Sequence, residues 1–327
     1  MKLATIAVEK PQTESEQRDG RLVIVDDQKQ TVRVVPPGVA PNFLFAIRNW
    51  ATVQPKLATV TGPDLPFSSV RFMAPLPRTT CWIDGSAYIQ HIVLVRKARG
   101  AEPPEDLRTV PLMYQGVADP LLGPRDDILV AEESYGIDFE AEVGVILDEV
   151  PMGTRAKDAG QYIRFVCVMN DVSLRNLIPR ELQAGFGFFH GKPPTSFAPF
   201  AITPDELGKA WKNGRVHLPM EVHLNGKKHG NPDAGEMFFS FPQLIQHAAK
   251  TRPLPAGTIL GSGTVSNDDT SRGSTCLAET RILEIINQGE AKTPFMQFGD
   301  RIQIAMHQKG KSVFGDIDQK VVRYVAP

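Results

Sequence analysis

The segment GIDFEAEVGVIL, residues 136–147, sets acidic side chains into an otherwise apolar run. Alternation of this kind predicts a β-strand, because successive side chains of a strand leave on opposite faces. The acidic face carries Asp138, Glu140 and Glu142, each about 6.5 Å from the next at roughly 3.3 Å rise per residue. Charges this close require either solvating water or a shared cation, and the segment alone leaves both open. The opposite face is typical of a core: Ile137, Phe139, Ala141, Val143, Val145 and Leu147.

Length and composition indicate an ordinary globular chain. It has 327 residues, 42% hydrophobic and 22% charged, which suits one large domain with a smaller companion. A net charge of -1 gives no basic excess for binding nucleic acid or an anionic membrane. No apolar run reaches the roughly 18 residues of a membrane span, and the first residues turn polar too early for a secretory signal. We therefore expect a cytoplasmic protein with neither nucleic-acid nor membrane partners.

The cysteine pattern points the same way. Cys81, Cys167 and Cys276 are odd in number and far apart, so the sequence predicts reduced thiols instead of a disulfide framework or a close-spaced zinc site.

Strand-like segments dominate the chain after residue 75. Helical patterns are fewer, covering residues 42–53, 173–183 and 241–250, and Asn225-Gly226 between two alternating runs predicts a hairpin. Strands and helices do not alternate regularly, which favours an α+β, mostly β fold, a roll or sandwich, over a doubly wound parallel sheet. We expect a small N-terminal β-rich domain over residues 1–75 and a second domain over 76–327. The strand segments predicted there are 128–133, 136–147, 163–172, 216–230, 258–265, 280–286 and 300–308.

Several isolated residues are suited to chemistry. Asp171 ends a buried strand and Arg175 follows one helical turn later, although Asp171 is also placed to cap a helix. Lys192 stands in the rigid loop GKPPTS, which suits an anionic substrate or a developing enolate as well as a solvent-facing lysine. His91 lies seven residues after Asp84. Because the chain has no HxxxH pair, His91 is a candidate general base more than a metal ligand, or else a structural histidine.

In chain order, these features resemble the fumarylacetoacetate hydrolase family over about residues 75–320. The resemblance rests on Asp84 with His91, DFEAE, NDVSLRN, GKPPTS, GSGT and STCLAE. It implies the roll fold of that family, a homodimer, and a divalent cation with Asp138 as a flanking acid. All-oxygen ligation favours Mg²⁺ or Ca²⁺, with Mn²⁺ also suitable, over zinc. The cation ligands implied are Asp84, Glu140, Glu142 and Asp171.

The resemblance also implies an activity on a small-molecule diketo acid. His91 and Glu279 would activate water for hydrolysis of a C–C bond in a 1,3-diketo acid, foremost fumarylacetoacetate to fumarate and acetoacetate in tyrosine degradation. Lys192 would stabilise or protonate the carbanion. Substrate oxygens would contact Arg175, Tyr114 and Thr264.

Two positions depart from the pattern of the family's diketone hydrolase. Ser86 replaces a tyrosine and Ile178 replaces a glutamine, so the acyl group of the substrate stays open. Alternatives are an acylpyruvate hydrolase or a β-keto acid decarboxylase of the same family, and a non-catalytic cation-binding β protein. The presence of both His91 and Glu279 favours hydrolysis, because decarboxylation needs no water nucleophile.

Overall fold

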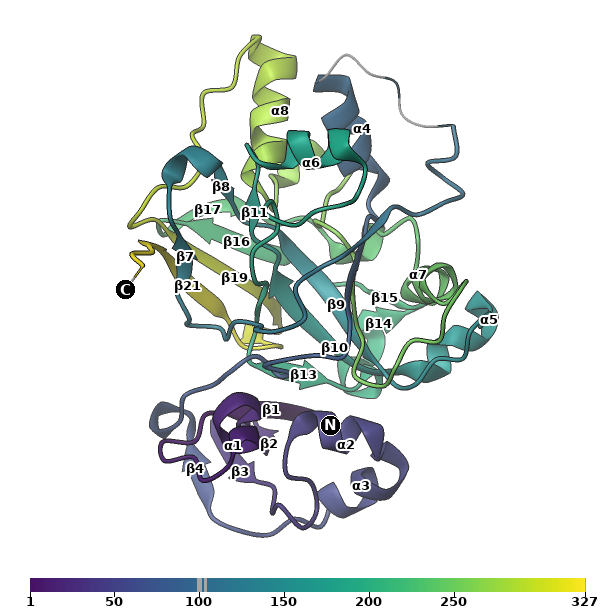
Figure 1. Ribbon diagram of the computed structural model, residues 1–327, viewed down its shortest axis with the longest axis vertical. Helices are drawn as coiled ribbons and strands as arrows, with labels where there is room; N and C mark the ends of the chain where they lie inside the picture. Colours follow the sequence, from purple (N-terminus) through teal and green to yellow (C-terminus); the bar gives the residue numbers. More distant parts are fainter. Residues whose placement is uncertain (99–101, 103–104, 327) are drawn as a thin grey trace.

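A large twisted sheet runs through the whole molecule in the computed structural model, which describes residues 1–98, 102 and 105–326 (Figure 1). The sheet is mostly antiparallel, with one parallel pair, β18 and β5. Its strands in spatial order are β4 (Asp64–Pro66), β3 (Thr31–Val34), β2 (Arg21–Asp26), β1 (Lys2–Ile6), β13 (Phe200–Ile202), β10 (Ile163–Asn170), β9 (Ala141–Leu147), β18 (Ile259–Gly261), β5 (Trp82–Gly85) and β6 (Met113–Gln115), with β12 (Ser196–Phe197) on β10.

A second sheet covers one face of the first. Its Val222, Ile304 and Val321 join Val143 and Val145 of β9 in one buried cluster, so the two sheets pack as a sandwich. The α+β fold expected from the sequence is confirmed. The strands of the second sheet are β17 (Lys227–Gly230), β16 (Met220–Leu224), β19 (Arg301–Gln308), β21 (Ile317–Arg323) and β7 (Ile128–Val130), with β20 (Lys311–Ser312) on β19.

The N-terminal segment continues the large sheet and does not stand apart from it. Strand β1 pairs antiparallel with β13, with Leu3 opposite Ala201. Helices α2 (Phe43–Arg48) and α3 (Trp50–Leu57) put Phe43 and Leu57 into a second buried cluster with Phe165 of β10, on the other face of the sheet. The domain boundary near residue 75 stays a prediction. Helix α1 (Glu14–Asp19) lies in the same segment.

Residues 136–147 form two strands with an interruption between them, not one continuous strand. Strand β8 (Ile137–Asp138) pairs with β11 (Ser173–Leu174), and β9 resumes at Ala141 and pairs with β10. The alternation is confirmed, because the apolar positions from Ile137 to Leu147 belong to one cluster whereas Ile146 belongs to the other. Both faces of β9 are buried, and Asp138, Glu140 and Glu142 are all buried, so bulk water does not solvate these acidic side chains.

Two sequence predictions of secondary structure are wrong. Residues 280–286, predicted as a strand from their β-branched side chains, lie inside α8 (Leu277–Gln288), which begins after the N-cap Cys276. Residues 173–183, predicted as one helix, form β11, a turn and the short α6 (Ile178–Ala184). Local propensity was overridden by pairing with β8, which a short window cannot reveal.

Other predicted elements are confirmed. Residues 42–53 are helical, and the helix predicted at 241–250 is α7 (Phe241–Ala248). Asn225 and Gly226 adopt φ of 52° and 74° between β16 and β17, as a two-residue hairpin turn requires. No helix among the described residues is both long and apolar enough to cross a membrane. The remaining elements are α4 (Ile89–Ala98), α5 (Ala156–Ala159), β14 (Trp211–Lys212) and β15 (Arg215–Val216).

Candidate active site

Three carboxylates meet across the neighbouring strands β10, β9, β18 and β5 of the large sheet. Asp84 lies on β5, Glu142 on β9, and Asp171 directly follows β10. Each places one carboxylate oxygen within 4.8 Å of the other two, and all three side chains are buried. The structure thus brings together three of the four cation ligands implied by the family resemblance.

The GSGT motif, residues 261–264, makes room for these acids. Gly261 lies on β18 between β9 and β5, and a Cβ there would clash with Oδ1 of Asp84 and lie 3.1 Å from Oε2 of Glu142. Gly263 has φ of 77°, and its backbone N–H donates to Oδ1 of Asp84 at 3.0 Å. The motif lacks the order of a phosphate-binding loop, and its glycines serve close approach of carboxylates.

The electrostatics of this cluster call for a cation. Burial, followed by the Asp171 carboxylate, raises the pKa of Asp84 to about 7. Burial, Asp84 and Asp171 raise the pKa of Glu142 well above its ordinary value. Both carboxylate oxygens of Glu142 are buried without a hydrogen-bond partner among the described residues. A hard divalent cation, which prefers carboxylate oxygen, fits this donor set.

Glu140 differs from the other acidic residues because both of its carboxylate oxygens already form ion pairs with positively charged side chains. Arg175 donates to Oε1 at 2.6 Å and Lys192 to Oε2 at 2.5 Å. Burial alone would raise the pKa of Glu140, but Arg175 and Lys192 outweigh it and lower the pKa. Lys192 also donates to Asp171 at 2.5 Å, so it bridges Glu140 to the acidic cluster. Glu140 thus lies beside the three-carboxylate group, linked to it through Lys192.

Asp138, the flanking acid, is fully engaged by hydrogen bonds from the start of α8 and from Arg175. Its oxygens accept from the backbone N–H groups of Leu277 and Ala278 at the start of α8, at 2.7 and 2.9 Å, and from Arg175 at 2.8 Å. Arg175 therefore spans Asp138 and Glu140 from a turn after β11. It does not lie on a helix one turn beyond Asp171, as the sequence pattern predicted, because residues 173–174 pair with β8.

Asp171 does not cap a helix. Its Oδ2 accepts from the hydroxyl of Tyr114 at 2.5 Å and its Oδ1 from Thr195 at 2.8 Å. Burial and the charge of Asp171 raise the pKa of Tyr114 well above its ordinary value, so the phenol stays neutral and donates. Tyr114 is thus held against the acidic cluster.

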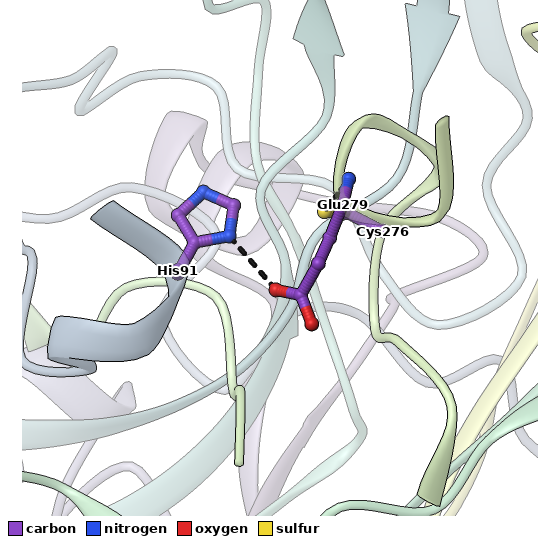
Figure 2. A group of neighbouring side chains, drawn as sticks. All are labelled: His91, Cys276 and Glu279. Atoms are coloured by element: carbon purple, nitrogen blue, oxygen red, sulfur yellow. Dashed lines mark hydrogen bonds and ion pairs between the residues drawn. The ribbon is translucent and has the colours of Figure 1, made fainter. Parts of the chain in front are cut away.

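A histidine–carboxylate pair joins α4 to α8, which pack against each other at one end of the molecule (Figure 1). Nδ1 of His91 lies 3.0 Å from Oε2 of Glu279 (Figure 2). Ser274 donates to the other Glu279 oxygen at 3.3 Å. Cys276 lies beside this pair, but burial and then Asp138 raise the pKa of its thiol well above the ordinary value. A protonated thiol is a poor metal ligand, so the geometry of this group suits a base held by a carboxylate better than a metal site.

One cavity of about 580 Å³ connects the histidine pair with the acidic cluster. His91, Asp84, Glu140 and Lys192 line it together with the predicted substrate contacts Tyr114, Arg175 and Thr264, and the two departures Ser86 and Ile178. The cavity also has an apolar wall, formed by Ile92, Leu112, Leu182 and Phe188. The sequence did not indicate this wall, because its side chains come from separate helices and loops of ordinary composition.

The chain belongs to the fumarylacetoacetate hydrolase family. Residues 80–322 match the model of the fumarylacetoacetate hydrolase C-terminal domain, and residues 1–78 match that of fumarylacetoacetase N-terminal domain 2. The family resemblance drawn from the motifs is confirmed.

Relatives of the chain are hydrolases and tautomerases of oxo acids. The chain is 26% identical over 67% of its length to a 2,4-didehydro-3-deoxy-L-rhamnonate hydrolase of a Sphingomonas species, covering 76% of that protein. It is 25% identical over 74% of its length to an oxaloacetate tautomerase of Bacillus subtilis, covering 72% of it.

A solved structure of maleylpyruvate hydrolase from Sphingobium superposes on 99% of the chain and 100% of its own, with a TM-score of 0.68 at 16% identity. At this identity the likeness shows the fold alone. A second structure of that enzyme holds manganese(II) and pyruvate.

Proposed function

We propose that this protein is a divalent-cation-dependent hydrolase that cleaves a C–C bond of a 1,3-diketo acid. The observation that carries the proposal is that His91, which contacts Glu279 behind it, lines the same cavity as Asp84 of the acidic cluster. A non-catalytic cation site would not require an oriented base beside it. Fumarylacetoacetate and the acylpyruvates of aromatic catabolism both belong to this substrate class.

The acidic residues would hold the cation. Asp84, Glu142 and Asp171 are its proposed ligands, with Glu140 next to them, and Mg²⁺, Mn²⁺ or Ca²⁺ suits their oxygens. When bound, such a cation supplies positive charge that withdraws electron density from the diketone oxygens. Two cationic side chains, Arg175 and Lys192, add to the positive charge on this side of the cavity.

His91 supplies the base. Nδ1–H donates to Glu279 in the tautomer that this contact favours, which leaves Nε2 free to take a proton from water. The resulting hydroxide adds to the acyl carbonyl carbon. The C–C bond then breaks, and its electron pair passes to the enolate of the departing oxo acid, which takes up a proton. Water is consumed, and the products are a carboxylic acid and a shorter oxo acid.

Keto–enol tautomerisation of an oxo acid is the second candidate. It is favoured by the similarity to an oxaloacetate tautomerase and by the same His91–Glu279 pair, which could move a proton between carbon and oxygen without water addition. The two activities differ in the fate of the solvent oxygen.

The deciding experiment uses the purified chain with Mg²⁺, Mn²⁺ or Ca²⁺ and a panel of 2,4-dioxo acids in water labelled with oxygen-18. Hydrolysis places one labelled oxygen in the new carboxylate and releases the shorter oxo acid in equal amount. Consumption of no diketo acid with any of the three cations would overturn the hydrolase proposal. Proton exchange without cleavage would support the tautomerase instead.

A further inference from the structure

The cavity beside the acidic cluster has one charged side and one apolar side. Asp84, Glu140, Arg175, Lys192 and His91 line the charged side. The remaining wall comes from the face of α4, the segment before β6, and α6 with the loop after it. Its apolar side chains are Ile92, Leu112, Ile178, Leu182 and Phe188, and the amide Gln183 of α6 also lines this side.

Both cationic side chains of the described cavity lining are already paired. Arg175 donates to Asp138 and Glu140, and Lys192 donates to Glu140 and Asp171. None of these contacts involves a side chain of the apolar wall. A second carboxylate on the substrate would therefore find no described lysine or arginine of this lining free to receive it.

The apolar wall begins directly at the cluster. Phe188 packs edge-on against Tyr114 with ring centroids 5.2 Å apart, and the Tyr114 hydroxyl donates to Asp171. Ile92 and Ile178 are 8% and 7% exposed, so the inner part of this wall is screened from water. A substrate tail leaving the diketone on this side meets side chains of isoleucine, leucine and phenylalanine.

From this arrangement, and resting on the proposed hydrolase function, we infer that the acyl tail of the substrate is uncharged and apolar. The substrate class is then a monoanionic 2,4-dioxo acid with an alkyl or aryl tail. A carboxylate at the tail end would lose its hydration against the apolar wall without gaining an ion pair. Each methylene added to an alkyl tail should raise kcat/KM by about fourfold until the wall is covered.

The test compares two substrates of equal length with the cation-loaded enzyme. 2,4-Dioxoheptanoate ends in a methyl group, and 2,4-dioxoheptanedioate ends in a carboxylate at the same position. We expect kcat/KM to favour the methyl compound by roughly 100-fold or more, because one unpaired charge in an apolar site is penalised to that degree. Equal turnover of both, or preference for the dianion, would overturn the inference while leaving the hydrolase proposal in place. Cleavage of neither would count against the hydrolase proposal itself.

Substitutions in the apolar wall test whether it is responsible for the preference between the two substrates. Ile178→Lys should raise kcat/KM for the dianion and lower it for the methyl compound, narrowing the ratio by at least about tenfold. Leu182→Lys tests the same point at a position that is 49% exposed, where a lysine does not threaten folding. Leu129→Lys is the matched control, since Leu129 is 55% exposed on β7 and lies outside the cavity lining. A ratio unchanged in both wall variants would contradict the assignment of the tail to this wall.

Discussion

Nδ1 of His91 and Oε2 of Glu279 lie 3.0 Å apart, although 188 positions of sequence separate the two residues. The pair exists because α4 and α8 pack against each other and because Glu279 is in the first turn of α8, where its orientation is fixed by Ser274. The carboxylate can therefore hold the imidazole in one tautomer and stabilise its protonated form.

Substitution of His91 or Glu279 should lower kcat, because the two residues act as one unit. His91→Ala is expected to lower kcat toward a diketo acid by roughly 10²- to 10⁴-fold, the usual contribution of a general base. Glu279→Gln should act in the same direction, because an amide can hold the ring but stabilises imidazolium poorly. The double variant should lose far less than the product of the two single losses, as residues that act as one unit do.

A matched control for these variants lies elsewhere in the chain. His307 and Glu221 form a second histidine–carboxylate pair at 3.2 Å, outside the cavity lining. His307→Ala should leave kcat unchanged, and none of the variants should alter cation affinity measured by calorimetry. Near-normal hydrolysis by His91→Ala with intact cation binding would refute the water-activating role of the His91–Glu279 pair.

The cation prediction centres on Glu142, whose oxygens have no other described partner. Glu142→Ala should weaken binding of Mg²⁺ or Mn²⁺ by more than the roughly 10- to 100-fold that loss of an outer partner of a metal ligand costs. Turnover should fall with it, whereas the chelated protein should become more stable because buried like charges are relieved. Titration calorimetry and thermal unfolding measure the two effects. Full activity of the unmodified chain after exhaustive chelation would exclude the cation requirement.

Asp138→Asn provides a contrast on the same acidic face. Asp138 binds the first N–H groups of α8 and Arg175, so its replacement should destabilise the fold by about 1–3 kcal/mol. Cation affinity should stay close to that of the unmodified chain. Chemical denaturation and calorimetry separate these outcomes, and a large loss of cation affinity without destabilisation would reverse the roles of Asp138 and Glu142.

Much of the site could be predicted because its residues stand in short motifs. The acids of residues 136–147 share one face by strand periodicity alone, and Asp171 follows a buried strand that is evident from its apolar run. The partner of each acid could not be predicted in this way. Lys192 lines the cavity, as a substrate contact requires, but its bridge between Glu140 and Asp171 depends on contacts remote in sequence.

The two wrong predictions of secondary structure, at residues 280–286 and 173–183, have the same physical cause. The helix α8 contains Ile282, Ile285 and Ile286, whose β-branched side chains favour strands locally, but its cap at Cys276 and its packing on α4 decide the conformation. Arg175 was expected on a helix, and the two-residue pairing of β11 with β8 moved it across to Asp138. In both cases tertiary contacts outweighed a preference worth a few tenths of a kcal/mol per residue.

Assembly is a separate prediction. We propose a homodimer, which is the state that the family resemblance implies. Sedimentation equilibrium should give twice the chain mass of 36.0 kDa at working concentration. A single species at the chain mass would contradict the proposal, and the activity at each concentration would show whether the site works in one chain.

The pH dependence of stability follows from the acids of the cluster. In the chelated protein the pKa of Asp84 is raised from 3.8 to about 7, so between these values the folded state binds more protons than the unfolded state. The stability that this group contributes is then fully present below its ordinary pKa of 3.8 and is lost as pH rises to about 7, by at most about 1.4 kcal/mol per pH unit. Glu142 is shifted in the same direction.

Bound cation should reverse this trend, because it favours the ionised carboxylates. We expect the Tm of chelated protein to fall from pH 5 to pH 8, and the Tm at saturating Mn²⁺ to stay level or rise over the same range. Asp84→Asn removes one titrating group, so it should flatten the chelated profile and abolish most of the response to Mn²⁺. Glu290→Gln, at an exposed carboxylate outside the cavity, is the control and should leave both profiles as they are. A chelated Tm that rose with pH across this window would show that Asp84 and Glu142 are ionised without a cation, and the electrostatic argument for the metal site would fail.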